Sequence, residues 1–118
     1  GTTEIAELKE DGSIERSTLT PADLGAKRLY SIEEIKGGAP ADNALITEAI
    51  LAGKGYRSTA AFVAANLTLL LKIGGLAKSL PEAVELARRT MASGKGLEVL
   101  NAHRAYAASH TASSQKAA

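Results

Sequence analysis

The longest apolar stretch of the sequence lies between residues 58 and 76, and from residue 60 to residue 71 only Asn66 and Thr68 are polar. A helix that is apolar on every side is normally buried. Its length falls well short of the ~20 residues that a membrane-spanning helix needs. We therefore predict a central core helix that ends at Gly74-Gly75 in a left-handed cap. Three of its large side chains are expected in the interior: Phe62, Leu69 and Leu70.

The N-terminal region is expected to form a β-hairpin. Residues 3–8 and 14–20 alternate polar and apolar side chains imperfectly, and Asp11-Gly12 between them is a hairpin turn signal. A two-stranded hairpin alone is marginal in water, so these strands need more sheet or a helix to pack on. The chain also begins at Gly1 without a methionine, within what looks like a strand. We therefore expect a processed chain, a fragment or an engineered piece.

Two short helical turns are expected next. Residues 20–25 combine a Thr cap, a proline and a terminating glycine, which leaves room for a single turn. Ser31 and Glu34 have the spacing of a capping box. Gly37-Gly38 can be a loop before a helix or a phosphate cradle at a helix N-terminus. We favour the loop, because neither the dinucleotide nor the P-loop glycine spacing is present.

Three further helices are expected, over residues 40–52, 80–92 and 95–108, and residues 109–118 are expected to fray. The buried stripe of the first is Leu45, Ile46, Ala49 and Ile50. That of the second is Leu80, Ala83, Val84, Ala87 and Met91, with Glu82, Glu85, Arg88 and Arg89 facing water. The third turns Leu97, Leu100 and Ala105 inward. The stripe from Leu80 to Met91 could also bind a partner, but such spacing is typical of a core.

Composition excludes several classes of function. The chain has 118 residues, 14 basic and 13 acidic side chains, and no cysteine. This balance gives no field for nucleic acid or an acidic partner, and the lack of cysteine excludes disulfides and thiolate chemistry. No signal segment or membrane span is visible. We expect one domain or part of one, located in the cytoplasm, with a core of Ala, Leu, Ile and Val.

Asn66 and the histidines are the conspicuous polar candidates. An amide in an apolar helix is expected to tether the backbone of a neighbouring loop, and the alternative is a substrate contact. His103 and His110 lack companion ligands for a metal site, so His103 is expected to be a half-exposed helix residue. The adjacent acidic pairs, Glu10-Asp11 and Glu33-Glu34, are expected to be solvated surface. Ser113 and Ser114 have no arranged base for nucleophilic catalysis, and Lys27-Arg28 is too short a basic patch for nucleic-acid binding.

The order of these signals resembles the C-terminal part of the anthranilate phosphoribosyltransferase (TrpD) family, from Thr3 to about Leu100. The resemblance rests on a series of short motifs: Pro21, Asp23 and Gly25; Gly37-Gly38 followed by Asp42-Asn43-Ala44; Asn66 nine residues before Gly75; and Ser93-Gly94-Lys95. The chain departs from the family's usual pattern at Leu67 and Thr68, where the family usually has alanines, and at Ala83, where it usually has a glycine after the glutamate. The alternative is therefore a non-catalytic TrpD-like protein that binds nucleic acid or a protein partner.

The resemblance implies an α/β parent fold, in which this segment is mainly α-helical with an N-terminal β-hairpin and helices packing on a sheet. Residues 1–108 would be the C-terminal portion of the α/β domain, with a structural role. Such enzymes transfer the phosphoribosyl group of phosphoribosyl pyrophosphate (PRPP) to anthranilate in tryptophan biosynthesis, with Mg²⁺. The family's catalytic, cofactor-binding and metal-binding motifs match no position here, so we assign no site residue. The implied partners are the missing N-terminal part of the same protein and a second copy in a homodimer.

Overall fold

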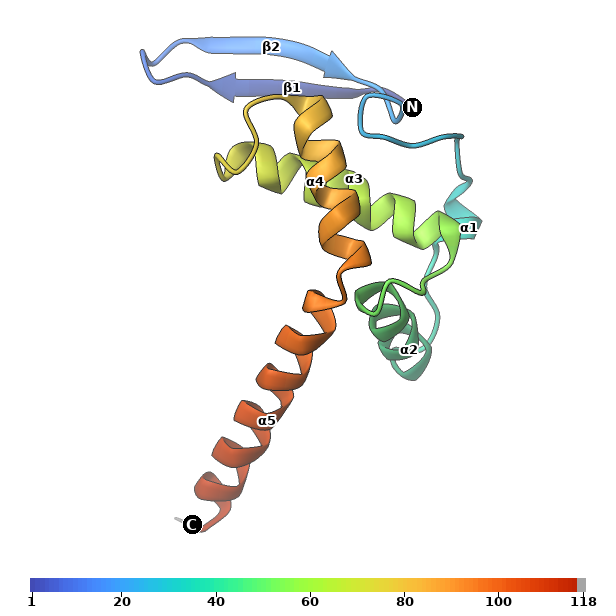
Figure 1. Ribbon diagram of the computed structural model, residues 1–118, viewed down its shortest axis with the longest axis vertical. Helices are drawn as coiled ribbons and strands as arrows, with labels where there is room; N and C mark the ends of the chain where they lie inside the picture. Colours follow the sequence, from blue (N-terminus) through green and yellow to red (C-terminus); the bar gives the residue numbers. More distant parts are fainter. Residues whose placement is uncertain (117–118) are drawn as a thin grey trace. The chain divides into compact units, whose positions relative to one another are not determined.

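The computed structural model describes the backbone of residues 1–116 and the side chains of residues 1–110 (Figure 1). The elements are β1 (Thr3–Leu8), β2 (Ile14–Leu19), α1 (Ile32–Ile35), α2 (Pro40–Leu51), α3 (Arg57–Ile73), α4 (Leu80–Ala92) and α5 (Lys95–Lys116). They form two compact units, the first made of residues 1–36 and 57–88 and the second of residues 37–56 and those from 89 onward. The predicted fold class, an N-terminal hairpin followed mainly by helices, is confirmed.

β1 and β2 pair in an antiparallel register that runs from Thr3 opposite Leu19 to Leu8 opposite Ile14. Gly12 has a φ of +83° in the turn, which favours glycine. The Asp11 carboxylate accepts the backbone N–H of Ser13 at 2.9 Å and so closes the turn. The hairpin that the sequence predicted is therefore confirmed, with its turn where Asp11-Gly12 indicated.

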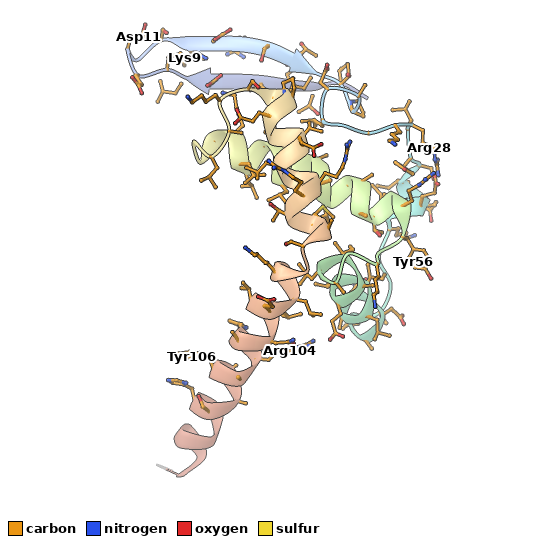
Figure 2. The ribbon with its side chains drawn as sticks, viewed as in Figure 1. Lys9, Asp11, Arg28, Tyr56, Arg104 and Tyr106 are labelled. Carbon is orange, nitrogen blue, oxygen red and sulfur yellow. The ribbon has the colours of Figure 1, made fainter. Side chains whose placement is uncertain are left out.

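Lys9 bridges two acidic side chains at the turn end of this hairpin, where Figure 2 labels it beside Asp11. Glu7 and Glu15 are directly opposite each other in the register, and like charges in that arrangement destabilise a strand pair. The Lys9 ammonium lies 2.8 Å from Glu7 and 2.7 Å from Glu15. Its hydrogen bonds to Glu15 and Glu7 raise the pKa of Lys9 and its bond to Glu7 lowers the pKa of that carboxyl.

The turn after β2 also forms as predicted. The Thr20 N–H donates to the Asp23 carboxylate at 2.8 Å, and the Asp23 N–H donates to the Thr20 hydroxyl at 3.3 Å. Gly25 ends the turn with a φ of +82°. A Cβ on Gly25 would lie 2.6 Å from Cγ1 of Val84. The turn therefore packs against α4 at a point where no side chain fits.

α2 begins at Pro40 and ends at Leu51, close to the predicted range, with Gly53 beyond it at a φ of +73°. Its predicted stripe is correct in part. Ile50 is buried, but Leu45 is 67% exposed, so that assignment was wrong. Within the second unit, α5 packs against one side of α2, and Arg104 of α5 forms an ion pair with Glu48 of α2. Leu45 therefore lies outside the side that has a partner.

α3 is not the enclosed core helix that its sequence predicted. Among its residues only Thr68 and Leu71 are buried, at 1% and 8% exposed, whereas Phe62 and Leu70 are 54% and 66% exposed and Leu69 is half-buried. The prediction was wrong because the sequence shows that each face of the helix is apolar, but burial also requires another segment that packs on each face. The first unit leaves the side chains of Phe62 and Leu70 largely uncovered. The end at Gly75, with a φ of +71°, is as predicted.

α4 packs through small residues. Ala83 and Ala87 are 0% exposed and belong to one cluster with Ala77 and Leu71. Thr68 donates its hydroxyl to the carbonyl of Ala64 at 2.8 Å, so its burial leaves the hydroxyl satisfied. The predicted stripe of α4 is confirmed, since all its members are buried or half-buried and the four charged residues named with it are exposed.

α5 is longer than predicted and continues to Lys116. Leu97 and Leu100 are half-buried as expected, whereas Ala105 is exposed and was wrongly placed. The predicted frayed tail, residues 109–118, lies partly outside the described residues and stays a prediction. Among the residues described, no helix has both the length and the apolar character that a membrane span requires.

Candidate functional site

A hollow of about 370 Å³ opens in the first unit, where the segment between β2 and α1 passes over one face of α3. From α3 it is lined by Phe62, Asn66 and Leu69, and from the segment above by Leu24 and Tyr30 among others. The lining is mainly apolar, with Arg28 as its charged member. Such a recess suits an apolar group better than a charged substrate.

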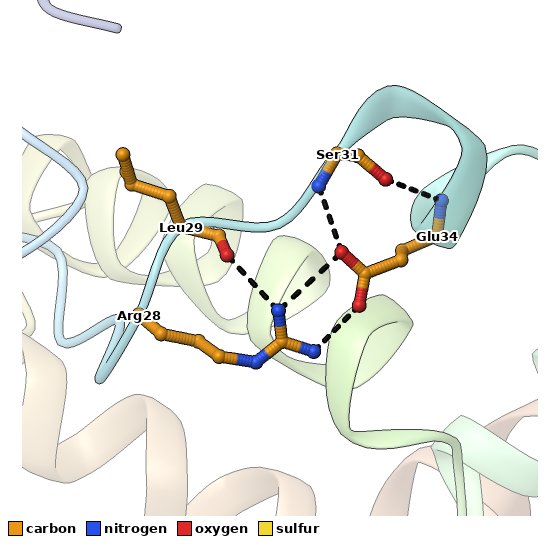
Figure 3. Close-up of polar contacts among 4 residues, drawn as sticks. All are labelled: Arg28, Leu29, Ser31 and Glu34. Atoms are coloured by element: carbon orange, nitrogen blue, oxygen red, sulfur yellow. Dashed lines mark hydrogen bonds and ion pairs between the residues drawn. The ribbon is translucent and has the colours of Figure 1, made fainter.

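Arg28 is held in place by several groups of its own segment (Figure 3). Its Nη2 donates to Oε1 of Glu34 at 2.5 Å, and its Nη1 donates to the carbonyl of Leu29 at 3.1 Å. The guanidinium also lies 4.0 Å from the centre of the Tyr30 ring, a cation–π distance. The charge of Arg28, at the edge of the hollow, is already paired with the Glu34 carboxylate. Arg28 is therefore not free to bind an anion in the hollow.

Glu34 is fixed from two sides. Its Oε2 accepts the N–H of Ser31 at 2.9 Å, and the Ser31 hydroxyl accepts the N–H of Glu34 at 3.4 Å. This is the predicted capping box of α1, which is confirmed. The hydrogen bond from Arg28 and then that from the Ser31 backbone lower the pKa of Glu34 to about 2. The same ion pair raises the pKa of Arg28.

The sequence analysis did not find the Arg28–Glu34 pair. It assigned Glu34 to solvated surface and treated Arg28 as part of a basic patch too short to bind nucleic acid. Six positions separate them, a spacing that matches neither helical nor strand periodicity. The signal that could have found the pair was the capping box, because it turns the Glu34 carboxylate back toward the chain that precedes α1. The neighbouring Glu33 behaves as expected, with its carboxylate exposed and 3.6 Å from the Lys36 ammonium.

Asn66 does not tether a neighbouring loop. Its side-chain amide donates to the carbonyl of Phe62 at 2.8 Å, within its own helix, and the residue is exposed. The prediction of a buried tether was wrong because the side chain satisfies a donor locally, as polar residues in helices often do. The structure places Asn66 in the lining of the hollow, so the alternative of a substrate contact stays a prediction.

Gly37-Gly38 forms the loop before α2 that the sequence favoured. The Gly38 N–H donates to Oδ1 of Asn43 at 2.8 Å, and Nδ2 of Asn43 donates to the Gly38 carbonyl at 3.0 Å. A Cβ on Gly37 would overlap the Asn43 side chain. The Gly38 amide is therefore used inside the loop, which argues against a phosphate cradle.

The two histidines lie apart from any cluster of metal ligands. His103 is exposed on α5, more open than the half-exposed position expected. The ring of His110 stacks on Tyr106 with 3.9 Å between centroids, and its Nδ1 lies 2.9 Å from the Tyr106 carbonyl. In the part of the chain that the structure describes, no three His, Cys, Asp or Glu side chains come together as metal ligands. These residues therefore do not fit the Mg²⁺ that the resemblance implies, and we derive no step through it.

The serines at positions 113 and 114 lie outside the described side chains. Asp11 closes the hairpin turn, so its carboxylate has a structural explanation. Within the described residues the arrangement thus offers an apolar recess, a neutralised arginine and local caps. It offers no arranged acid, base or nucleophile for a chemical step.

Comparison with known protein families identifies the family to which the chain belongs. The model of the glycosyl transferase family, a/b domain, matches residues 1–97. The chain belongs to this family. The matched residues include both strands, α1 to α4 and the start of α5, so the family assignment covers the first unit entirely.

Members of the family with high similarity are called anthranilate phosphoribosyltransferases. That of Tolumonas auensis is 47% identical over 98 residues, which are 83% of this chain and 29% of the relative. That of Shewanella putrefaciens is 50% identical over 101 residues, 86% of this chain and 28% of the relative. That of Colwellia psychrerythraea is 45% identical over 100 residues, 85% of this chain and 27% of the relative. The chain therefore spans less than a third of the length of these relatives.

Proposed function

We propose that residues 1–108 form the C-terminal portion of the α/β domain of a phosphoribosyltransferase that acts on PRPP and anthranilate. The observation that carries this proposal is the identity of 45–50% to anthranilate phosphoribosyltransferases over more than four-fifths of the chain. The family description, a glycosyl transferase, agrees with transfer of a phosphoribosyl group. The reaction is thus proposed for the whole protein, of which this chain is one section.

Within the whole protein, the role of this section is structural. The capping box of α1 and the Arg28–Glu34 pair fix the segment that covers α3, and the loop before α2 is closed by Asn43. These contacts hold backbone segments in place, and a misplacement of ~1 Å that arises far from the chemistry can lower the rate about a hundredfold. Groups that bind the pyrophosphate and Mg²⁺ would come from other parts of the protein.

A chimera tests the proposal. The chain replaces the 98 matched residues of the Tolumonas auensis enzyme, and formation of phosphoribosyl-anthranilate from PRPP, Mg²⁺ and anthranilate is followed by fluorescence. We expect a kcat/KM within about tenfold of the parent, because the replaced section supplies contacts and not reacting groups. The isolated chain, assayed in parallel, should give no product. A folded chimera without activity, or turnover by the isolated chain, would contradict the proposal.

A further inference from the structure

The turn of the β-hairpin contains an aspartate that is followed directly by a glycine, Asp11-Gly12. Figure 2 labels Asp11 at this end of the hairpin, and both residues are exposed. A Cβ added to Gly12 would meet no atom within 4 Å, so the space beside the glycine is open. A turn with so few contacts opens locally at a low cost in free energy.

An aspartate followed by a glycine can rearrange its own backbone. The amide nitrogen of Gly12 attacks Cγ of the protonated Asp11 carboxyl, an N–Cγ bond forms, and the carboxyl hydroxyl leaves with the amide proton as water. Water then opens this cyclic imide, a succinimide, at either carbonyl. Opening at the main-chain carbonyl leaves the chain linked through Cγ, as isoaspartate. One water is released and one is consumed, and a glycine favours the attack because no side chain shields its nitrogen.

The closed turn engages the attacking nitrogen. The Gly12 N–H donates to the carbonyl of Lys9 at 3.0 Å, and the Lys9 N–H donates to the carbonyl of Ser13 at 2.9 Å. The attack requires the Gly12 amide to give up its proton, which here lies in the hydrogen bond that closes the turn. The rearrangement therefore requires the turn to open first.

Ser13 engages the other reacting group, the Asp11 carboxylate. The backbone N–H and the hydroxyl of Ser13 donate to the same oxygen, Oδ1, at 2.9 and 2.6 Å. The hydrogen bond from the hydroxyl, and then that from the backbone, lower the pKa of Asp11. A lower pKa reduces the fraction of protonated carboxyl at a given pH, and only the protonated form can release water. Ser13 therefore restrains both the position and the protonation of the carboxyl.

We propose that Asp11 is a modification site, where the backbone rearranges through a succinimide to isoaspartate, and that the hydrogen bonds from Ser13 slow this reaction. Isoaspartate adds one CH₂ group to the main chain within the turn. The hydrogen bond from Gly12 to Lys9 then loses its geometry, and the strand pairing beside the turn weakens. The inference concerns the hairpin alone and is independent of the proposed reaction.

Incubation in heavy-oxygen water tests the proposal. The whole chain is kept in mildly acidic buffer and then digested with trypsin, and the peptide isomers are separated by chromatography and identified by mass spectrometry. Each passage through the succinimide places one heavy oxygen in residue 11. Asp23 is the internal control, because its carboxylate accepts the N–H and the hydroxyl of Thr20 at 2.8 and 2.6 Å but a leucine follows it. We expect label and isoaspartate at Asp11 before any appears at Asp23.

The same incubation in urea measures the effect of the turn without any substitution. With the turn open, isoaspartate at residue 11 should form at least about tenfold faster than in the folded chain. Equal rates in urea and in buffer would overturn the proposal that the turn slows the reaction. Absence of isoaspartate at residue 11 in urea would overturn the modification site itself.

Two substitutions isolate the Ser13 hydroxyl. Ser13→Ala loses its hydrogen bond and should form isoaspartate at least about threefold faster, the effect expected of one hydrogen bond. Ser13→Thr keeps a hydroxyl and should react at the rate of the parent chain. A parental rate in Ser13→Ala would overturn the role of Ser13. So would equal acceleration in both variants, because the hydroxyl would then not be the group that slows the reaction.

Discussion

Arg28 and Glu34 lie six positions apart and join the chain before α1 to the first turn of that helix, with Nη2 of the arginine 2.5 Å from Oε1 of the glutamate. Both side chains keep about half or less of their surface exposed, 55% and 38%. The pair therefore fixes the segment that lines the hollow beside α3 while remaining in contact with water.

The pair makes the stability of the first unit depend on pH. The folded pKa of Glu34 is lowered from 4.5 to about 2, so its pairing stabilises the fold above pH 4.5 and is lost as the pH falls toward 2. Glu34→Gln should reduce the fall in melting temperature over this range. Thermal unfolding followed by circular dichroism at several pH values measures the melting temperature. Glu33→Gln is the control, because it keeps the contact between Arg28 and Glu34. An unchanged pH profile in Glu34→Gln would contradict the assignment.

Gly25 should be sensitive to substitution for two separable reasons. Gly25→Ala places an L residue at a φ of +82° and a Cβ 2.6 Å from Val84. The backbone conformation costs about 1–2 kcal/mol, and the overlap about 1–3 kcal/mol more. Gly12→Ala is the matched control, since its φ is +83° and no atom lies within 4 Å of the added Cβ. Urea unfolding should show a larger loss at position 25, and equal losses would exclude the Val84 overlap.

Asn43 should control the loop before α2. Asn43→Ala removes both hydrogen bonds to Gly38, which together contribute about 1–2 kcal/mol, so exchange of the Gly38 amide should accelerate several-fold. Asn43→Asp keeps an acceptor for that amide and should retain most of its protection. NMR exchange rates at Gly38 decide the point. Equal rates in the two variants would show that the amide is protected by another group.

Ala87 should not accept a larger side chain. It is 0% exposed in the small-residue cluster between α3 and α4, so Ala87→Leu should destabilise the chain by about 1–3 kcal/mol through overpacking. Ala102→Leu, at an exposed position of α5, should change stability by less than about 0.5 kcal/mol. Denaturant unfolding of both variants measures the difference. A neutral Ala87→Leu would mean that this contact is looser than the structure shows.

Local signals were sufficient to predict the caps and turns. Gly12, Gly25 and Gly75 adopt the positive φ values that their contexts indicated, and Ser31 with Glu34 forms the expected capping box. Each of these features depends on residues within a few positions of one another. A single sequence contains that information directly.

The burial of α3 could not be predicted in this way. Phe62 and Leu70 are as apolar as Leu71, yet only Leu71 has neighbours that cover it. Which side of a uniformly apolar helix is covered depends on the presence and placement of other segments. Asn66 illustrates the same limit. Its amide donates to the Phe62 carbonyl of its own helix and not to a neighbouring loop, and the sequence does not specify which acceptor lies within reach.

Lys9 has a practical consequence for experiments on the hairpin. Its ammonium lies between Glu7 and Glu15, at 2.8 and 2.7 Å. Acylation of that amine by a succinimidyl dye would remove the positive charge and leave two carboxylates facing each other across the strands. A fluorophore attached there would weaken the strand pairing that it was meant to report.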